Sequence, residues 1–314
     1  MFHTTSPTVK GFLNARKMAA VLLLIVAQGL GAAHAAGEGA SYTKEIAPGL
    51  FSFGPGNGYH SMFLVTNDGV AVFETINTQH STELLAAIRK VTKQPIRYAF
   101  HSHNHWDHAS GGKVFQDVGA KTIMHQFAAE WLEAHPGQDT SPPNMVWSGK
   151  RKDINIGGTT VELHYLGLNH GLGMTVFVIP EMRAAYIADL VTPNRVMFSI
   201  VPDFNIAEWE RTLGEMQALP FDIAVCSHNE LPVAQVPDGC SMTHLKETQE
   251  FIQDIRGAIF AEFKKGTPPF TIPSVVKLPK YSHWAHYDDW LEMNVLRVML
   301  DLWMGPYPWV PGQS

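Results

Sequence analysis

The chain has 314 residues, of which 45% are hydrophobic, 11% aromatic and 17% charged. This composition can fill the core of one large domain or two small ones, and it excludes disordered, collagen-like and coiled-coil classes. The net charge of −6, from 23 Lys and Arg against 29 Asp and Glu, comes without a basic stripe, so we expect no nucleic-acid partner.

Residues 1–35 have the pattern of a secretory signal peptide. Three basic residues precede an apolar run from Met18 to Ala33, and a small-residue triplet ends at Ala35. An uncleaved membrane anchor is the alternative, but the run is shorter than the ~20 residues that a spanning helix needs. We therefore expect cleavage after Ala35, a periplasmic or secreted protein, and no stable membrane anchor once the signal is removed.

The rest of the chain reads as one globular unit, since no period of 20 to 50 residues recurs. Strand patterns cover residues 50–53, 61–65 and 70–74, and Asn67-Asp68-Gly69 predicts a hairpin turn between the last two. A helix is predicted from about Ser81 to residue 91. The chain thus begins with antiparallel hairpins.

Strands and helices alternate further along the chain. Strands are predicted over 96–100, 121–125, 159–166, 175–179, 184–188 and 223–226, and helices over 207–219, 244–265 and 287–304. A Pro-rich stretch over 267–279 connects the last two helices. Hairpins followed by this alternation are typical of a layered α/β protein with mixed sheets.

Two cysteines, Cys226 and Cys240, are too few for a disulfide scaffold, and no C-x-x-C pair is present. An oxidising compartment would allow them to pair, and two buried free thiols are the alternative. The sequence leaves both open, because it does not show whether the two Cα atoms come close enough.

A histidine-rich segment, His103-Asn104-His105-Trp106-Asp107-His108, directly follows the strand predicted at 96–100. In extended chain His103 and His105 project to the same side, while Asp107 and His108 lie where the chain turns. Four metal-ligand side chains therefore converge at one strand end. A solvated histidine-rich loop is the alternative.

This segment resembles the H-x-H-x-D-H motif of the metallo-β-lactamase superfamily of metallohydrolases, which it meets without departure. The resemblance runs from about Ala47 to Glu230. It implies an α/β fold of four layers, αβ/βα, in which two mixed β-sheets are flanked by helices. The family places another His, an Asp and a last His at later strand ends, and His170, Asp189 and His228 occupy those places in order.

The resemblance implies a site for two Zn²⁺ ions, and Fe or Mn would also suit its ligands. The implied ligands are His103, His105 and His170 for one ion, Asp107, His108 and His228 for the other, and Asp189 as the bridge. Asp107 and Asp189 are expected to be catalytic as well. Two such ions lower the pKa of a shared water toward ~7 and polarise a carbonyl. Taken singly, each remote ligand has an ordinary alternative, a polar core residue for the histidines and a helix cap for Asp189.

Two positions depart from the family pattern. Glu74 stands where the family usually has Asp, and Asn169-His170-Gly171 replaces the usual Gly-His-Thr. Candidate substrate contacts are aromatic or polar residues of the same region and of the C-terminal part, namely Tyr59, His60, Trp106, Asn229 and Trp284. About half of such aromatic residues are simply part of a core.

The resemblance favours an exported dinuclear zinc hydrolase that cleaves an ester, thioester or lactone of a small molecule. A β-lactamase is the alternative, since residues 211–222 are similar to the third subclass of those enzymes. Against it, Asp189 matches the bridging carboxylate of the other members, where the lactamases usually have Cys or Ser. A metal-binding protein without catalysis is the second alternative, which the complete ligand set disfavours.

The sequence therefore divides into a signal peptide over 1–35, a metallohydrolase domain over 36–240 and a helical extension over 241–314. The last predicted helix is apolar over a wide face, with residues such as Val295 and Val298. We expect it to pack on the domain or on a partner subunit of a homo-oligomer.

Overall fold

The computed structural model describes residues 41–229 and 240–307. The signal peptide predicted over residues 1–35 lies outside these described ranges. Within them, no helix combines the length and the apolar character that crossing a membrane requires.

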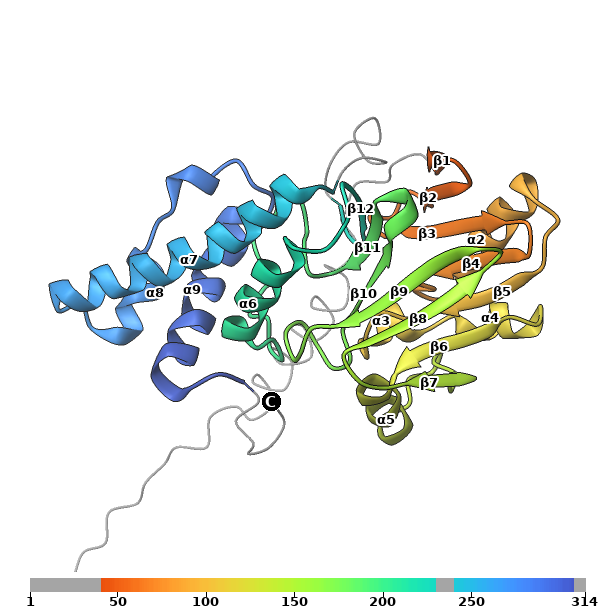
Figure 1. Cartoon of the computed structure of the whole chain (residues 1–314). Coiled ribbons are helices and arrows are strands. Elements are labelled where there is room, and N and C mark those ends of the chain that lie inside the picture. The colour runs from red at the N-terminus through yellow and green to blue at the C-terminus, as the bar shows by residue number, and fades with distance from the viewer. Residues whose placement is uncertain (1–40, 230–239, 308–314) are drawn as a thin grey trace, which may run out of the picture. The chain divides into compact units, whose positions relative to one another are not determined.

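The first half of the chain builds a mixed seven-stranded sheet whose strands lie in chain order (Figure 1). Its strands are β1 (Tyr42–Ala47), β2 (Leu50–Gly54), β3 (Ser61–Thr66), β4 (Gly69–Phe73), β5 (Ile96–Phe100), β6 (Lys121–His125) and β7 (Met145–Trp147). The pairs from β1 to β4 are antiparallel, and those from β4 to β7 are parallel. The hairpin turn predicted at residues 67–69 joins β3 to β4, where Thr66 pairs with Gly69.

The second half builds a five-stranded sheet in the order β12-β11-β10-β9-β8. Its strands are β8 (Arg151–Ile156), β9 (Thr159–Tyr165), β10 (Thr175–Ile179), β11 (Ala184–Ala188) and β12 (Ile223–Cys226). Only β11 and β12 run parallel, and α6 (Ile206–Met216) connects them, since a parallel pair needs a long crossover.

The two sheets bury one face against each other and the outer face against helices. In β3 and β4, Met62 and Phe73 point into the core shared with the second sheet, while Phe63 and Val72 point into a smaller core. That smaller core lies under α2 (Thr78–Val91) and α4 (Gly112–Asp117). This alternation has the period of two that a strand imposes, and it confirms two mixed sheets flanked by helices.

The C-terminal helices join the main core. They are α7 (Met242–Lys265), α8 (Ile272–Val275) and α9 (Tyr287–Met304), with single 3-10 turns at η4 (Pro269–Thr271) and η5 (Pro279–Tyr281). Helix α7 contacts α6 and α9, and Phe251, Ile255 and Val298 belong to the same hydrophobic cluster as the inner strands. The described part of the helical extension therefore packs on the two-sheet body.

Several elements differ from the sequence prediction. Strands β1, β7 and β8, which the sequence did not reveal, lie at sheet edges. Strand β7 has only three residues, and β8 buries only Ile154 and Ile156 of its six. Short or polar edge strands of this kind carry little hydrophobic pattern. The short helices α3 (Trp106–Ala109) and α5 (Gln126–Ala134) and the turn η2 (Pro180–Met182) were also missed. The predicted Pro-rich connector contains η4 and α8, and η5 begins at its last residue.

Cys226 and Cys240 form a disulfide, with their Cα atoms 5.9 Å apart. Cys226 ends β12, and Cys240 lies two residues before α7. Of the two alternatives that the sequence left open, the structure therefore has the pair. The bond fastens the helical extension to the last strand of the second sheet.

Candidate metal centre

The histidine-rich segment turns from the end of β5 into α3. His105 has an extended backbone and precedes the first residue of α3, so Asp107 and His108 lie in the helix itself. The imidazole ring centre of His103 lies 4.4 Å from that of His105 and 4.6 Å from that of His108. The segment thus brings its three histidines together at the end of β5, where the sequence predicted that ligand side chains converge.

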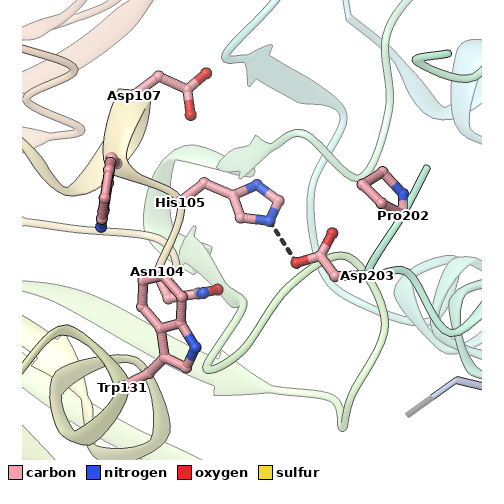
Figure 2. A pocket seen from close by; sticks show the side chains of 7 residues that line it. Asn104, His105, Asp107, Trp131, Pro202 and Asp203 are labelled. Atoms are coloured by element: carbon pink, nitrogen blue, oxygen red, sulfur yellow. Dashed lines mark hydrogen bonds and ion pairs between the residues drawn. The ribbon is translucent and has the colours of Figure 1, made fainter. Parts of the chain in front are cut away.

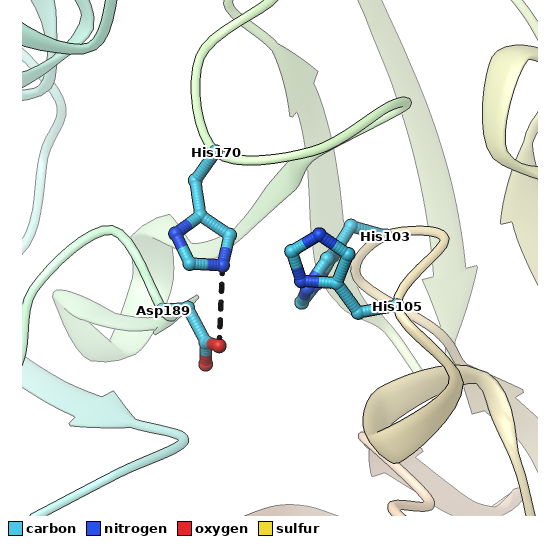
Figure 3. A group of neighbouring side chains, drawn as sticks. All are labelled: His103, His105, His170 and Asp189. Carbon is cyan, nitrogen blue, oxygen red and sulfur yellow. Dashed lines mark ion pairs between the residues drawn. The ribbon is translucent and has the colours of Figure 1, made fainter. Parts of the chain in front are cut away.

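The three remote residues reach the same place from loops that follow strands of the second sheet. His170 lies between β9 and β10, Asp189 follows β11, and His228 follows β12. Asp189 Oδ2 lies 3.1 Å from Nε2 of His108, 3.3 Å from Nε2 of His170 and 3.5 Å from Nε2 of His228. One carboxylate oxygen therefore lies among nitrogens of both expected ligand groups, as Figure 3 shows for the group of His170.

The ligand atoms form groups that could hold metal ions. Within each group all ligand atoms lie within 4.8 Å of one another, and the groups are His103, His105, His170 and Asp189; Asp107, His108 and His228; and Glu74, His103 and His108. The structure thus brings together all seven side chains that the resemblance implied.

Buried polar atoms at this site suit a cation. Among the residues that the structure describes, Nε2 of His103 and Oδ1 of Asp189 are buried and make no hydrogen bond. Leaving such atoms unsatisfied costs about 1–3 kcal/mol each. A bound divalent ion would satisfy both, because neutral imidazole and carboxylate are zinc ligands.

The charges of the side chains in the cluster also suit a bound cation. Burial lowers the pKa of His108, but Asp189 and Asp107 raise it by more, so it lies well above its usual value. Burial raises the pKa of Asp189, but His108 and His228 lower it well below the usual value. The carboxylates therefore hold a positive charge in the buried site, which a metal cation would supply.

Glu74, one of the two departures from the family pattern, lies beside two of the expected ligands, His103 and His108. It is fully buried after β4, and its carboxylate accepts a hydrogen bond from the hydroxyl of Ser102. The Ser102 hydroxyl lies 2.7 Å from Nδ1 of His103, and Glu74 Oε2 lies 3.5 Å from Nδ1 of His108. Such outer partners fix the orientation of ligand rings.

A pocket of about 400 Å³ opens beside the cluster (Figure 2). It is lined by Asn104, His105, Trp106, Asp107, Trp131, Pro202 and Asp203. Asp203 Oδ2 lies 2.7 Å from Nε2 of His105. Trp131, Pro202 and Asp203 were not predicted from the sequence, because no motif surrounds them.

Three of the five candidate substrate contacts lie at the cluster or its pocket. The hydroxyl of Tyr59 donates to Asp107 Oδ2 at 2.9 Å, and its ring centre lies 4.4 Å from that of His228. Trp106 is 50% exposed at the pocket. Asn229 follows His228 directly, and its backbone N–H donates to the carbonyl of Gly58.

His60 and Trp284 do not line this pocket, and their contact with a substrate stays a prediction. His60 follows Tyr59 in extended chain and so points to the opposite side, where its Nδ1 lies 2.9 Å from the Tyr42 hydroxyl. Burial, assisted by the charge of His228, lowers the pKa of His60 to about 4. Trp284 is 7% exposed, with its ring centre 4.7 Å from that of Tyr281. Neither residue lines the pocket, and Trp284 is part of the core.

Comparison with known proteins points to one family. A family model described as the metallo-beta-lactamase superfamily matches residues 55–228. The alpha subunit of 2,4-dinitroanisole O-demethylase from Nocardioides sp. (strain JS1661) is 30% identical over 136 residues, which are 43% of this chain and 41% of that subunit. The chain therefore matches about two fifths of this relative's length.

Solved structures share the fold at low identity. A metallo-beta-lactamase from Pontibacter korlensis superposes with a TM-score of 0.57 at 18% identity, over 68% of this chain and 99% of that one. The stereoselective inverting sec-alkylsulfatase Pisa1 from Pseudomonas sp. superposes with a TM-score of 0.63 at 15% identity, over 84% of this chain and 50% of that one. At these identities the likeness concerns the fold.

Proposed function

Since the chain belongs to the metallo-beta-lactamase superfamily, we propose that it is a hydrolase that uses two divalent metal ions, zinc first, to cleave an ester, thioester or lactone. The observation that carries the proposal is the position of Asp189 Oδ2, within 3.1 to 3.5 Å of nitrogens from His108, His170 and His228. A carboxylate placed between two ligand groups is suited to bridge two ions. Iron or manganese would fit the same donor atoms.

When bound, two such ions activate a water and polarise the substrate carbonyl. The chain's own residues would orient the metal ligands and bind the substrate. The Tyr59 hydroxyl holds Asp107 through a hydrogen bond of 2.9 Å. Trp106 and Trp131 form an apolar wall of the pocket, where the non-reacting part of a substrate would bind.

The charge of the pocket supports a preference for uncharged or cationic substrates. Asp107 and Asp203 line it, and no Lys or Arg is among its described lining residues. A β-lactam antibiotic carries a carboxylate, which the side chain of Asp203 would repel. Together with Asp189, this pocket favours the ester, thioester or lactone over the β-lactam alternative.

Cleavage of an aryl methyl ether, which is uncharged, is a second candidate. It is supported by the relative matched by sequence, which is a subunit of a 2,4-dinitroanisole O-demethylase. An aryl methyl ether therefore belongs in the substrate panel.

Elemental analysis and a substrate panel test the proposal. After zinc reconstitution we expect two ions per chain, and Asp189→Ala should lose one of them, since His103, His105 and His170 remain for the other. The exposed Asp222→Asn, which changes the charge equally, should keep both. One ion or fewer in the wild type would refute the dinuclear site. A kcat/KM for a cephalosporin above those for all esters, thioesters and lactones would favour the lactamase.

We also propose that the protein is exported. The signal-peptide pattern of residues 1–35 supports this, and so does the Cys226–Cys240 disulfide, because such bonds persist in oxidising compartments. N-terminal sequencing of the protein from its native cells should begin at Ala36. A cytoplasmic protein that still begins at Met1 would contradict the proposal.

A further inference from the structure

The loop over residues 197–205, between β11 and α6, is fastened by α9. The amide of Asn294 and the guanidinium of Arg297 are both buried, at 0% and 3% exposure. They donate to four backbone carbonyl groups of the loop, those of Met197 and Ser199 for Asn294 and those of Val201 and Phe204 for Arg297. Buried hydrogen bonds of this kind, charge-assisted for Arg297, are strong.

The backbone of this loop needs such support. Ser199 and Val201 have positive φ angles of 46° and 40°, which side chains other than glycine rarely adopt. Strained residues of this kind persist only where the surroundings hold them in place. The carbonyl groups of these same two residues accept hydrogen bonds from α9. Helix α9 therefore sets the conformation of the loop.

The loop in turn touches the metal centre at two points. Asp203 Oδ2 lies 2.7 Å from Nε2 of His105 (Figure 2), and the ring centre of Phe204 lies 3.8 Å from that of His170. A carboxylate at neutral pH only accepts hydrogen bonds, so Nε2 of His105 carries the proton and donates. The nitrogen of His105 that is left for a metal ion is then Nδ1.

We propose that Asp203 is a positioning residue for His105, and that α9 holds it there, so the C-terminal extension is part of the metal centre. The inference rests on the proposed metal site. A histidine ligand commonly donates its outer N–H to a carboxylate, which fixes the tautomer and the ring orientation. Asp203 does for His105 what Ser102 and Glu74 do for His103, but from a segment anchored to α9.

Metal affinity measured by competition with a chelator tests the role of Asp203, with Zn²⁺ and with Co²⁺, whose absorption spectrum reports the ligand geometry. Asp203→Ala should bind one of the two ions about 10- to 100-fold more weakly and leave the other unchanged. Asp203→Asn keeps an oxygen that accepts the proton of Nε2, so its loss should be smaller. The charge-matched control Asp222→Asn should bind both ions as the wild type does.

The outcomes separate this inference from the proposed function. A wild type that binds no ions would refute the proposed metal site itself. A wild type that binds two ions, with Asp203→Ala equal to it in affinity and Co²⁺ spectrum, would overturn the role of Asp203 alone.

A double-mutant cycle tests the role of α9. Arg297→Lys keeps the positive charge but loses the guanidinium group that donates to two carbonyl groups of the loop. The loop should therefore be less well held, and the ion that Asp203→Ala weakens should also bind more weakly in Arg297→Lys. Combined with Asp203→Ala, it should cause a smaller loss than the sum of the two single losses, because both changes act on the contact between Asp203 and His105. Arg183→Lys, an exposed substitution of the same kind, is the control. Unchanged affinity in Arg297→Lys, or additive losses, would overturn the link to α9.

Discussion

Gly171, next to His170, lies directly against the histidine-rich segment. A Cβ atom at this position would lie 2.9 Å from Oδ1 of Asn104, 3.1 Å from Nε2 of His105 and 3.2 Å from Cδ2 of His103. The φ angle of Gly171 is +74°, which also disfavours a side chain. The Gly in place of the family's usual Thr therefore lets the two loops approach each other.

We predict that Gly171→Ala weakens both stability and metal binding. A positive φ costs an alanine roughly 1–2 kcal/mol, and the added methyl group also presses on Asn104 and His105. Gly149→Ala is the matched control, since Gly149 has a φ of +87° and nothing within 4 Å of an added Cβ. Urea unfolding of the metal-free protein and zinc titration measure the two effects. Equal losses in the two variants would show that crowding at Gly171 is unimportant.

At the scale of elements, α2 buries a histidine in its first turn. The helix begins at Thr78, three residues before the predicted Ser81, because the side chain of Asn77 caps it by accepting from the backbone N–H of His80 at 2.9 Å. The imidazole of His80 is 1% exposed, and its Nε2 lies 2.8 Å from the hydroxyl of Ser61 on β3. The contact between α2 and the sheet thus includes a buried imidazole.

This imidazole makes stability depend on pH. Burial, with smaller effects from the charges of His60 and His108, lowers the pKa of His80 to about 3. In the unfolded chain its pKa is about 6.5. Between these two values the unfolded chain binds a proton that the native chain does not. The free energy of unfolding should therefore fall as the pH drops below about 6.5, by up to ~1.4 kcal/mol per pH unit from this group.

Urea unfolding of the metal-free protein between pH 7 and pH 4 checks this prediction. His80→Gln should reduce the slope of the free energy of unfolding against pH by up to ~1.4 kcal/mol per pH unit, the contribution of one proton. Ser81→Ala removes a buried hydrogen bond to the carbonyl of Thr75 without changing a titratable group, so it should lower stability equally at every pH. A His80→Gln slope equal to that of the wild type would contradict the assignment.

At the scale of the whole molecule, the disulfide and α9 bind the helical extension to the two-sheet domain. The Cys226–Cys240 bond closes a loop with a sequence separation of 14 that contains His228. In the chain-entropy model, a loop of this length contributes about 3 kcal/mol by restricting the unfolded chain.

We predict that the double variant Cys226→Ala with Cys240→Ala unfolds at a lower urea concentration than the oxidised wild type, with a loss of about 3 kcal/mol. The reduced wild type should resemble the variant, and reductant should not change the variant further. A wild type whose unfolding is insensitive to reductant would contradict a stabilising disulfide.

The sequence by itself determined the features that depend on local spacing. The strands at 96–100, 121–125, 175–179, 184–188 and 223–226 and the helix at 287–304 have the predicted bounds, because buried strands and helices impose their period on the residues. His103, His105 and His108 meet because they lie within six consecutive residues that follow the end of one strand. The remote ligands His170, Asp189 and His228 were predicted only from the resemblance to a known family.

Tertiary structure alone decided the rest. Asp203 meets His105 across 98 residues, and α9 reaches the same loop from more than 90 residues further along the chain. Edge strands such as β8 and the position of Trp284 in the core could not be predicted from the sequence either. Periodicity fixes which side chains share a face of one element, whereas contacts between distant segments depend on how whole elements pack, and no spacing in the sequence encodes that.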